Sequence, residues 1–282
     1  MIPGRTMSAL KQRLGFIGAG KMATALARGF IAAGLVKPEQ VSASDVADSA
    51  AEEFAKTTGG KRAADNAAVL AGSDVVFLAV KPQHFPAAAE SIKGAWKASH
   101  LAVSVMAGIS TATLAERLGD APRIVRVMPN TPCLIGQGAS GYCLGPRATP
   151  ADGELVGRLL KAVGIAFPLD EKLLDVVTGL SGSGPAFVYV MIEALADGGV
   201  RMGLSRDVAT ALAAQTVAGA ARMVLETGQH PAALKDQVAS PGGTTIRGLQ
   251  ALEEHGVRGG LIAAVQAATE RSMELGQQPV SK

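Results

Sequence analysis

The chain has 282 residues, and at roughly 150 residues per domain this length predicts about two domains. Its formal net charge is only +3 and its lysines and arginines form no basic stripe, which argues against a nucleic-acid-binding protein. It contains two cysteines, Cys133 and Cys143, which are too few for a disulfide framework and favour a reducing cytoplasm.

The first 13 residues carry basic side chains but no apolar segment of signal-peptide length, so residues 1–13 are expected to form a disordered N-terminal extension. Two later stretches, 98–115 and 176–192, lack Asp, Glu, Lys and Arg and need comparison with membrane spans. Both are interrupted by Gly, Ser or Pro and do not exceed the roughly 18 to 20 apolar residues that a span requires. We therefore expect both to lie in the interior of a protein that does not enter a membrane.

From residue 14 to residue 168, short β-branched runs alternate with segments of helical spacing. The strand-like runs are 14–18, 41–44, 75–80, 101–108 and 123–128, and the helical segments include 22–33, 49–58 and 111–118. This alternation is typical of a parallel sheet covered by helices on both faces. Residues 14–168 are therefore expected to form an α/β domain.

After Pro168 the strand signals almost disappear, and Ala-rich helical segments follow. They are predicted at 185–202, 206–226, 231–238, 245–254 and 257–275. Several are apolar on more than one side, and such helices must be buried in their own domain or against a partner subunit. Residues 169–282 are therefore expected to form an all-α domain.

The segment between the first strand and the first helix reads GAGKMA from Gly18 to Ala23, a G-x-G-x-x-A pattern. In Rossmann-type domains the first glycine makes the tight turn, the second lets the backbone approach the pyrophosphate, and the third small residue lets helix and strand touch. The helix N-terminus then presents free N–H groups to the phosphates. We interpret the segment as a dinucleotide cofactor site; the alternative is a turn that is glycine-rich only for close packing.

The second strand ends at Ser44 and Asp45, about 25 residues after Gly20. At this position an acidic side chain accepts hydrogen bonds from the ribose 2′-hydroxyl of NADH, whereas Arg, Lys or hydroxyl groups favour the 2′-phosphate of NADPH. Asp45 is equally well placed to cap the helix that follows. The sequence leaves the preference between the two cofactors open.

A second candidate anion site is the segment SPGGTT, from Ser240 to Thr245. Its glycines allow a turn that exposes consecutive N–H groups, and a predicted helix begins there. Such a concave turn at a helix N-terminus suits a carboxylate. The alternative is a capped helix entry that binds no ligand.

No metal site is expected, because the histidines share no metal-ligand spacing with each other or with a cysteine. The isolated histidines are His84, His100, His230 and His255. Cys133 and Cys143 lack a His or Asp constellation and are expected to be small, buried apolar residues.

Six segments resemble pyrroline-5-carboxylate reductase. They are GFIGAGKM (15–22), FLAVKP (77–82), VMPNTP (127–132), GLSGSGPAF (179–187), ADGGVRMGL (196–204) and ALKDQVASPGGTTIRGLQALEEHG (233–256). The resemblance runs in order from about Leu14 to Leu275, and its KDxVxSPGGTT part is the most specific because generic Rossmann proteins lack it. It implies a Rossmann-type domain, a helical dimerisation domain, and reduction of 1-pyrroline-5-carboxylate to L-proline, the last step of proline biosynthesis.

The resemblance also implies roles for individual residues. NADPH or NADH would be held by Gly18, Ala19, Gly20, Lys21, Met22, Ser44, Asp45, Asn66, Ala79, Val80, Lys81, Pro82, Met106, Ala107 and Gly108. The substrate would be held by Glu171, Gln237, Ser240, Gly243, Thr244 and Thr245. Thr245, or a water that it positions, is the candidate catalytic group. A homodimer through the C-terminal helices, and a ring of such dimers, are implied as well.

The reduction of the imine requires little catalytic assistance from the protein, because a protonated cyclic imine accepts hydride readily at its C=N carbon. Proximity and orientation can lower such a barrier by up to roughly 7 to 11 kcal/mol, which is compatible with the lack of an obvious strong acid. Two alternatives stay open. One is a related Rossmann-plus-helical reductase of keto or hydroxy acids, although Lys161, Lys172 and Lys235 stand in no matching motif. The other is a non-catalytic sensor of NADP or proline.

Overall fold

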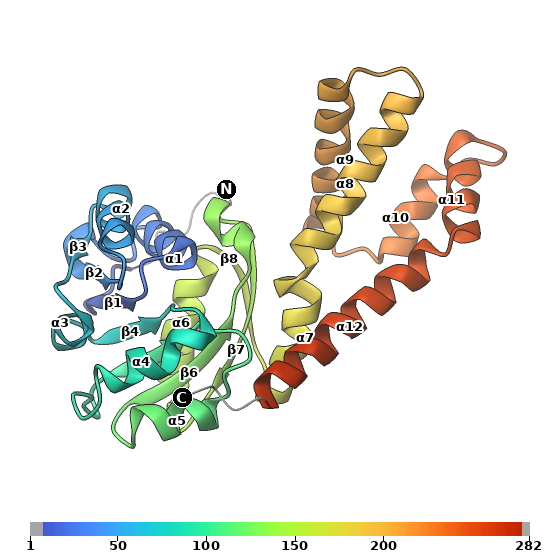
Figure 1. Cartoon of the computed structure of the whole chain (residues 1–282). Coiled ribbons are helices and arrows are strands. Elements are labelled where there is room, and N and C mark those ends of the chain that lie inside the picture. The colour runs from blue at the N-terminus through green and yellow to red at the C-terminus, as the bar shows by residue number, and fades with distance from the viewer. Residues whose placement is uncertain (1–7, 278–282) are drawn as a thin grey trace. The chain divides into compact units, whose positions relative to one another are not determined.

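The computed structural model describes residues 8–277, which form two compact units (Figure 1). Residues 8–182 and 268–277 make up the first unit, and residues 183–267 make up the second. The chain thus leaves the first unit after Gly182 and returns to it within its last helix. The contacts therefore divide the chain at two places, after residue 182 and after residue 267, and not once after residue 168.

Within the described residues, the first unit is built on an eight-stranded sheet in the order β3-β2-β1-β4-β5-β6-β7-β8. The strands are β1 (Leu14–Ile17), β2 (Val41–Ser44), β3 (Lys61–Arg62), β4 (Val75–Leu78), β5 (Leu101–Ser104), β6 (Arg123–Met128), β7 (Gly138–Leu144) and β8 (Gly164–Pro168). Strands β1 to β6 are parallel, β7 is antiparallel to β6, and β8 is parallel to β7. The predicted parallel α/β sheet is therefore confirmed, with β3, β7 and β8 added to it.

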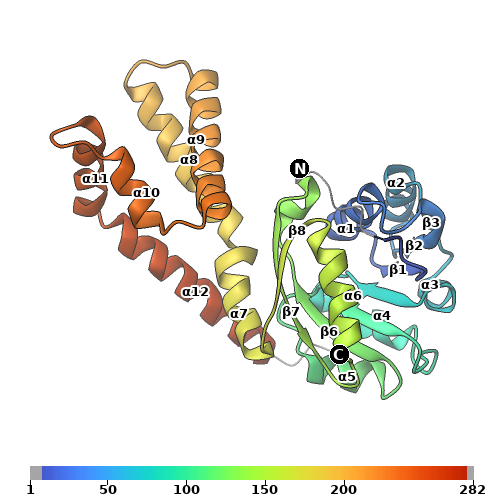
Figure 2. The same ribbon diagram turned by 180° about the vertical axis from the view of Figure 1, so that it is seen from behind.

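Helices cover both faces of this sheet. They are α1 (Lys21–Ala32), α2 (Asp48–Thr58), α3 (Asn66–Gly72), α4 (Phe85–Glu90), α5 (Thr111–Leu118) and α6 (Pro150–Lys161). Residues of α1, α2 and α6 enter one buried cluster, and residues of α3, α4 and α5 enter the other. Neighbouring strand residues such as Phe16 and Ile17 enter opposite clusters because side chains alternate along a strand. Figure 2 shows α6 running beside β7 and β8.

Short helical segments complete the first unit. They are η1 (Pro38–Gln40), η2 (Pro82–His84), η3 (Thr131–Ile135), η4 (Glu171–Leu173), α7 (Leu174–Val177) and the π-helical turn η5 (Thr178–Gly182). A Cβ added to Gly141 of β7 would lie 2.9 Å from Val177 and 3.1 Å from both Leu169 and Leu174. This close packing of α7 on the sheet explains why residues 169–182 belong to the first unit.

The predicted N-terminal extension falls into two parts. Residues 1–7 lie outside the described residues. In residues 8–13, the N–H of Leu10 donates to the carbonyl of Leu35 at 2.7 Å, and the Gln40 side chain donates to the carbonyls of Leu10 and Gln12. Because these bonds hold the segment and the Leu10 side chain is buried, the expectation of disorder does not apply to residues 8–13.

The second unit consists of helices that begin and end close to the predicted positions. They are α8 (Gly184–Arg201), α9 (Arg206–Thr227), α10 (Pro231–Val238), α11 (Thr244–Glu254) and the first half of α12 (Val257–Gln277). Its small core lies between α8 and α9 and contains Ala196, Ala209 and Ala213, with Ile192 and Val200 packed against it. Small side chains therefore let these two helices approach closely.

Two helical stretches, Glu171–Arg201 and Arg206–Thr227, are long and apolar enough to cross a membrane by length and composition alone. Core helices of soluble proteins pass the same test, but only 11% of the most apolar window of each stretch is buried here. Most large apolar residues of 98–115 are buried, as predicted. The expectation of burial for 176–192 is wrong for the single chain, because residues such as Leu180, Tyr189 and Val190 are exposed and need a further surface to cover them.

Candidate active site

The turn between β1 and α1 leaves the first turn of α1 without a side-chain cap. Gly18 has a φ of +95°, and a Cβ there would lie 2.8 Å from the Ala79 carbonyl and the Val80 nitrogen, so this position requires glycine. Gly20 is the N-cap of α1 and has no atom within 4 Å of the place that its Cβ would occupy. No side chain among residues 8–277 caps this helix, and its first turn holds no acidic residue. The N-terminus of α1 is therefore open to an anion.

Asp45 is bonded to this turn and does not cap α2. Its carboxylate accepts hydrogen bonds from the N–H of Ala19 at 2.8 Å and from the N–H of Ala47 at 3.0 Å. The interpretation of Asp45 as the helix cap is wrong, because the extra turn at residues 45–47 delays the start of α2 until Asp48 and makes Ala47 the N-cap. The carboxylate thus lies at the edge of the glycine-rich turn.

Ser44 and Asn66 are joined at the carboxyl end of β2. The buried Ser44 hydroxyl donates to Oδ1 of Asn66 at 2.7 Å, and Nδ2 of Asn66 donates to Oγ of Ser91 at 2.9 Å. These two bonds orient the Asn66 amide beside the end of β2.

The ends of β4 and β5 lie next to the glycine-rich turn, because β1, β4 and β5 are parallel neighbours. The N–H of Ala79 donates to the carbonyl of Ile17 at 2.8 Å, and the N–H of Val105 donates to the carbonyl of Leu78 at 3.1 Å. Met106 is buried, and Gly108 has a φ of +72°. The structure therefore brings residues 79–82 and 106–108 to the same edge of the sheet as Gly18.

The SPGGTT segment forms a turn at the N-terminus of α11, in the second unit. Gly242 has a φ of +66°, and the N–H of Gly243 donates to the carbonyl of Ser240 at 3.1 Å. Gly243 is the N-cap, and no side chain of the described part of the chain caps this end. Thr245 is half-buried in the first turn of α11. Gln237, on the preceding helix, is exposed and donates to the side chain of Gln229.

Glu171, predicted on the substrate side, lies in the first unit with both carboxylate oxygens engaged. They accept hydrogen bonds from Thr111 and from Arg126, which is buried in β6. Arg126, Asp175 and Ser272, none of which was predicted from the sequence, complete this group. A signal for Arg126 exists, since it stands as a charged residue inside the otherwise apolar run IVRVM.

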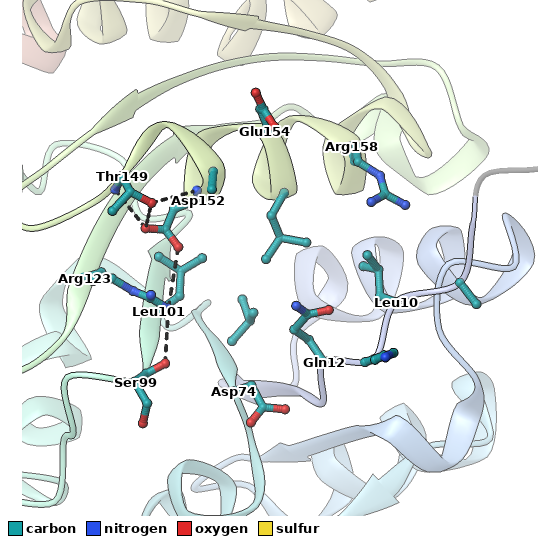
Figure 3. Close-up of a pocket in the computed structure, with 15 residues that line it drawn as sticks. Leu10, Gln12, Asp74, Ser99, Leu101, Arg123, Thr149, Asp152, Glu154 and Arg158 are labelled. Atoms are coloured by element: carbon teal, nitrogen blue, oxygen red, sulfur yellow. Dashed lines mark hydrogen bonds and ion pairs between the residues drawn. The ribbon is translucent and has the colours of Figure 1, made fainter.

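A cavity of about 710 Å³ lies at the opposite, amino-terminal ends of β4, β5 and β6 (Figure 3). Several of its polar groups are paired with one another. Asp152 accepts a hydrogen bond from the Thr149 hydroxyl and lies 3.6 Å from Arg123, which donates to the carbonyl of Ser99. Ligands of open α/β sheets bind beyond the carboxyl ends of the strands, so this cavity is not the candidate active site.

The two cysteines are free and buried. Burial raises the pKa of the Cys133 thiol, and burial together with the charge of Glu171 raises the pKa of Cys143 to about 11. Both are therefore protonated at neutral pH and are poor nucleophiles. Across residues 8–277, no three His, Cys, Asp or Glu side chains are grouped so that they could hold a metal ion.

Two family models match the chain: pyrroline-5-carboxylate reductase dimerisation over residues 171–275, and NADP oxidoreductase coenzyme F420-dependent over residues 13–108. The chain is 47% identical over 267 residues to the pyrroline-5-carboxylate reductase of Methanosarcina acetivorans, which covers 95% of this chain and 99% of that protein. It is 47% identical over 265 residues to the pyrroline-5-carboxylate reductase of Arabidopsis thaliana, with 94% and 96% covered.

Solved structures of pyrroline carboxylate reductases are also similar to this chain in fold and sequence. The pyrroline carboxylate reductase of Plasmodium falciparum with NADP bound superposes with a TM-score of 0.86 at 35% identity, over 96% of this chain and 100% of that one. The pyrroline-5-carboxylate reductase of Coxiella burnetii gives a TM-score of 0.89 at 34% identity, over 95% and 100%.

The parallel sheet, its open glycine-rich turn and the helices that follow define a nicotinamide-dependent oxidoreductase with a Rossmann-type domain and a helical dimerisation domain. The relatives narrow this class further. The chain belongs to the pyrroline-5-carboxylate reductase family.

Proposed function

We propose that this protein reduces 1-pyrroline-5-carboxylate to L-proline with NADPH or NADH. The observation that carries the proposal is the 47% identity with a pyrroline-5-carboxylate reductase over 95% of the chain. The open turn at the N-terminus of α1 supports it independently, because that turn suits the phosphates of a dinucleotide.

The cofactor side of the proposed site fits a dinucleotide. The free space at Gly20 and the uncapped N–H groups of α1 form a cradle that a Cβ at position 20 would fill. Bound NADPH or NADH supplies a hydride. We assign the pyrophosphate to residues 18–22, the adenosine half to Ser44, Asp45 and Asn66, and the ribose and nicotinamide side to residues 79–82 and 106–108.

On the substrate side, the uncapped N–H groups at Ser240–Thr245 are assigned to the substrate carboxylate, with Gln237 nearby in the chain. The Thr245 hydroxyl is assigned to the ring nitrogen, where it keeps or delivers the proton that makes the imine carbon electrophilic. Since both oxygens of Glu171 are already engaged by Thr111 and Arg126, we assign this residue to orienting the site.

The helical half is assigned to homodimer formation. Large apolar side chains of α8 and α9, such as Tyr189, Val190 and Leu212, are exposed in the single chain, and an exposed patch of this kind favours association. The dimerisation model of the family spans residues 171–275. A ring of dimers and a cytoplasmic location complete the proposal, the latter supported by the two cysteines and their free state.

The test uses the purified full-length chain with pyrroline-5-carboxylate and each of NADPH and NADH, followed at 340 nm, with a 2-keto acid as the control substrate. Imine-dependent oxidation of either cofactor is expected. Turnover of the keto acid alone would identify a keto-acid reductase, and cofactor binding without turnover would identify a sensor. Light scattering on the same sample should give an even multiple of the chain mass: twice that mass for a single dimer and a larger even multiple for a ring of dimers. A fully active monomer would contradict the dimer assignment.

A further inference from the structure

Arg126 carries a charge inside the first unit, at the fourth position of β6. Only 6% of its side chain is exposed. Its Nη1 donates to Oε1 of Glu171 at 3.1 Å, and its Nη2 lies 3.6 Å from Oδ1 of Asp175. A buried guanidinium needs such partners, because an unpaired charge in the interior is strongly destabilising.

Glu171 connects this cation to the start of α5. Its Oε1 also accepts the N–H of Thr111 at 2.7 Å, and its Oε2 accepts the Thr111 hydroxyl at 2.5 Å. Burial alone would raise the pKa of this carboxyl, but the bonds from Thr111 and the charge of Arg126 bring the pKa below its ordinary value. Thr111 directly follows residues 105–110, the β5–α5 loop that carries Met106, Ala107 and Gly108.

Asp175 connects the same cation to the end of α12. Its Oδ1 accepts the hydroxyl of Ser272 at 2.7 Å, and Ser272 is only 3% exposed. One turn later, α12 reaches the β5–α5 loop itself: a Cβ on Gly276 would lie 3.2 Å from the Gly108 carbonyl, and a Cβ on Gly108 would lie 3.7 Å from that of Leu275. The loop is therefore held at its end by Glu171 and at its middle by α12.

We propose that Arg126, Glu171, Asp175 and Ser272 form a positioning network that fixes the β5–α5 loop, with the last turns of α12 as its support. The inference rests on the proposed function, which assigns this loop to the nicotinamide side. None of the four side chains has to touch cofactor or substrate. They act through the loop, and hydride transfer is sensitive to placement, since a shift of about 1 Å can cost roughly 100-fold in rate.

Two variants of the full-length protein test the network. Ser272→Ala removes one hydrogen bond with little change in volume, and Glu171→Gln removes the charge that links Arg126 to Thr111. Glu274→Gln is the matched control, because Glu274 lies on α12 and pairs only with the exposed Arg271 in the described structure. We expect kcat to fall about 3- to 10-fold for Ser272→Ala and roughly 10- to 100-fold for Glu171→Gln, and to stay unchanged for the control.

Two readouts separate positioning from mere stability. The isotope effect with [4-²H]NADPH should rise in both network variants, because hydride transfer becomes more rate-limiting. Affinity for NADPH should fall relative to affinity for 2′-phospho-ADP-ribose, which lacks the nicotinamide. This binding ratio needs no turnover, so it tests the network even if the wild-type chain fails to reduce the imine and the proposed function is wrong.

The proposal is overturned if the variants lose thermal stability while kcat, the isotope effect and the binding ratio stay at the values of the Glu274→Gln control. Should Glu171→Gln fail to fold, Ser272→Ala decides alone. A wild-type isotope effect and binding ratio in Ser272→Ala would then remove α12 from the network and contradict the inference.

Discussion

Gly18 and Gly20 stand two residues apart in the glycine-rich turn, yet the structure predicts opposite consequences for their replacement by alanine. At Gly18 the backbone has a φ of +95° and a Cβ would lie 2.8 Å from three backbone atoms of Ala79 and Val80. At Gly20 the backbone is extended, with a φ of −71°, and the Cβ position is empty. Gly18→Ala should therefore damage the fold, and Gly20→Ala should damage only cofactor binding.

The magnitudes follow from these geometries. For Gly18→Ala, left-handed backbone strain of about 1–2 kcal/mol and overpacking of about 1–3 kcal/mol sum to about 2–5 kcal/mol. At about 2–4 °C per kcal/mol for a unit of this size, Tm should fall by about 4–20 °C. For Gly20→Ala, the loss of glycine entropy from the unfolded chain should stabilise the fold by about 0.4–1 kcal/mol. Loss of one charge-assisted N–H bond to phosphate, about 1.5–3 kcal/mol, should weaken NADPH binding roughly 10- to 100-fold.

Thermal unfolding followed by circular dichroism without cofactor, together with fluorescence titration of NADPH at a temperature where all proteins are folded, measures both effects. Gly34→Ala is a useful comparison, because Gly34 has a φ of +69° but no neighbour within 4 Å of its Cβ position and so isolates the strain. Equal losses of Tm at positions 18 and 20, or wild-type NADPH affinity in Gly20→Ala, would refute the reasoning.

Four further outcomes are expected. Thr245→Ala should lower kcat a few-fold to about tenfold and Thr245→Ser should restore it, whereas a raised KM with unchanged kcat would limit this residue to substrate binding. Asp45→Ser should raise the ratio of kcat/KM for NADPH over NADH, because a carboxylate opposes the 2′-phosphate; an unchanged ratio would leave Asp45 only the role of holding the Ala19 N–H. The Cys143 thiol, with a pKa of about 11, should resist iodoacetamide in the folded protein and react after unfolding, and fast labelling of the native state would disprove its burial. Because folding raises this pKa, the thiol contributes stability at low pH that is lost as pH rises from about 8.5 toward 11, so Cys143→Ser should flatten that loss in denaturant titrations at increasing pH.

Local signals account for the parts of the fold that the sequence predicts. Helices α8 to α11 begin and end within two residues of their expected positions, and the run at 123–128 coincides with β6. The strand β7 has the sequence GASGYCL, whose glycines and serine favour no strand. It forms through pairing with β6 on one side and β8 on the other, which a local sequence pattern does not reveal. The start of helix α6 carries signals that its sequence shows: Pro150 at the first position and reciprocal capping between Thr149 and Asp152.

The candidate site likewise contains some parts that the sequence predicts and others that it does not. The glycine-rich turn and the SPGGTT turn are predictable because a single short segment carries each. The partners of Arg126 are not, since Glu171 is 45 residues away in sequence, and Asp175 is joined to Ser272 across 97 residues. For Asp45, the sequence predicts a place near the cofactor turn but not the partner of its carboxylate. The N–H groups of Ala19 and Ala47 and the start of α2 all compete for that carboxylate, and only the three-dimensional structure shows which of them it bonds.

Because the chain returns to its first unit, residues 183–267 lie in sequence between two segments of that unit. Exchange of this helical segment between relatives requires two crossovers, one on each side, and a single junction after residue 168 would strip Arg126 of both carboxylates. A separate cofactor-binding protein is better obtained by joining Gly182 to Ala268 through a flexible linker, which retains α7 and the last turns of α12. Any deletion or exchange of the helical segment must therefore be made at two junctions, Gly182 and Ala268, which lie 86 positions apart in sequence and enclose one continuous segment.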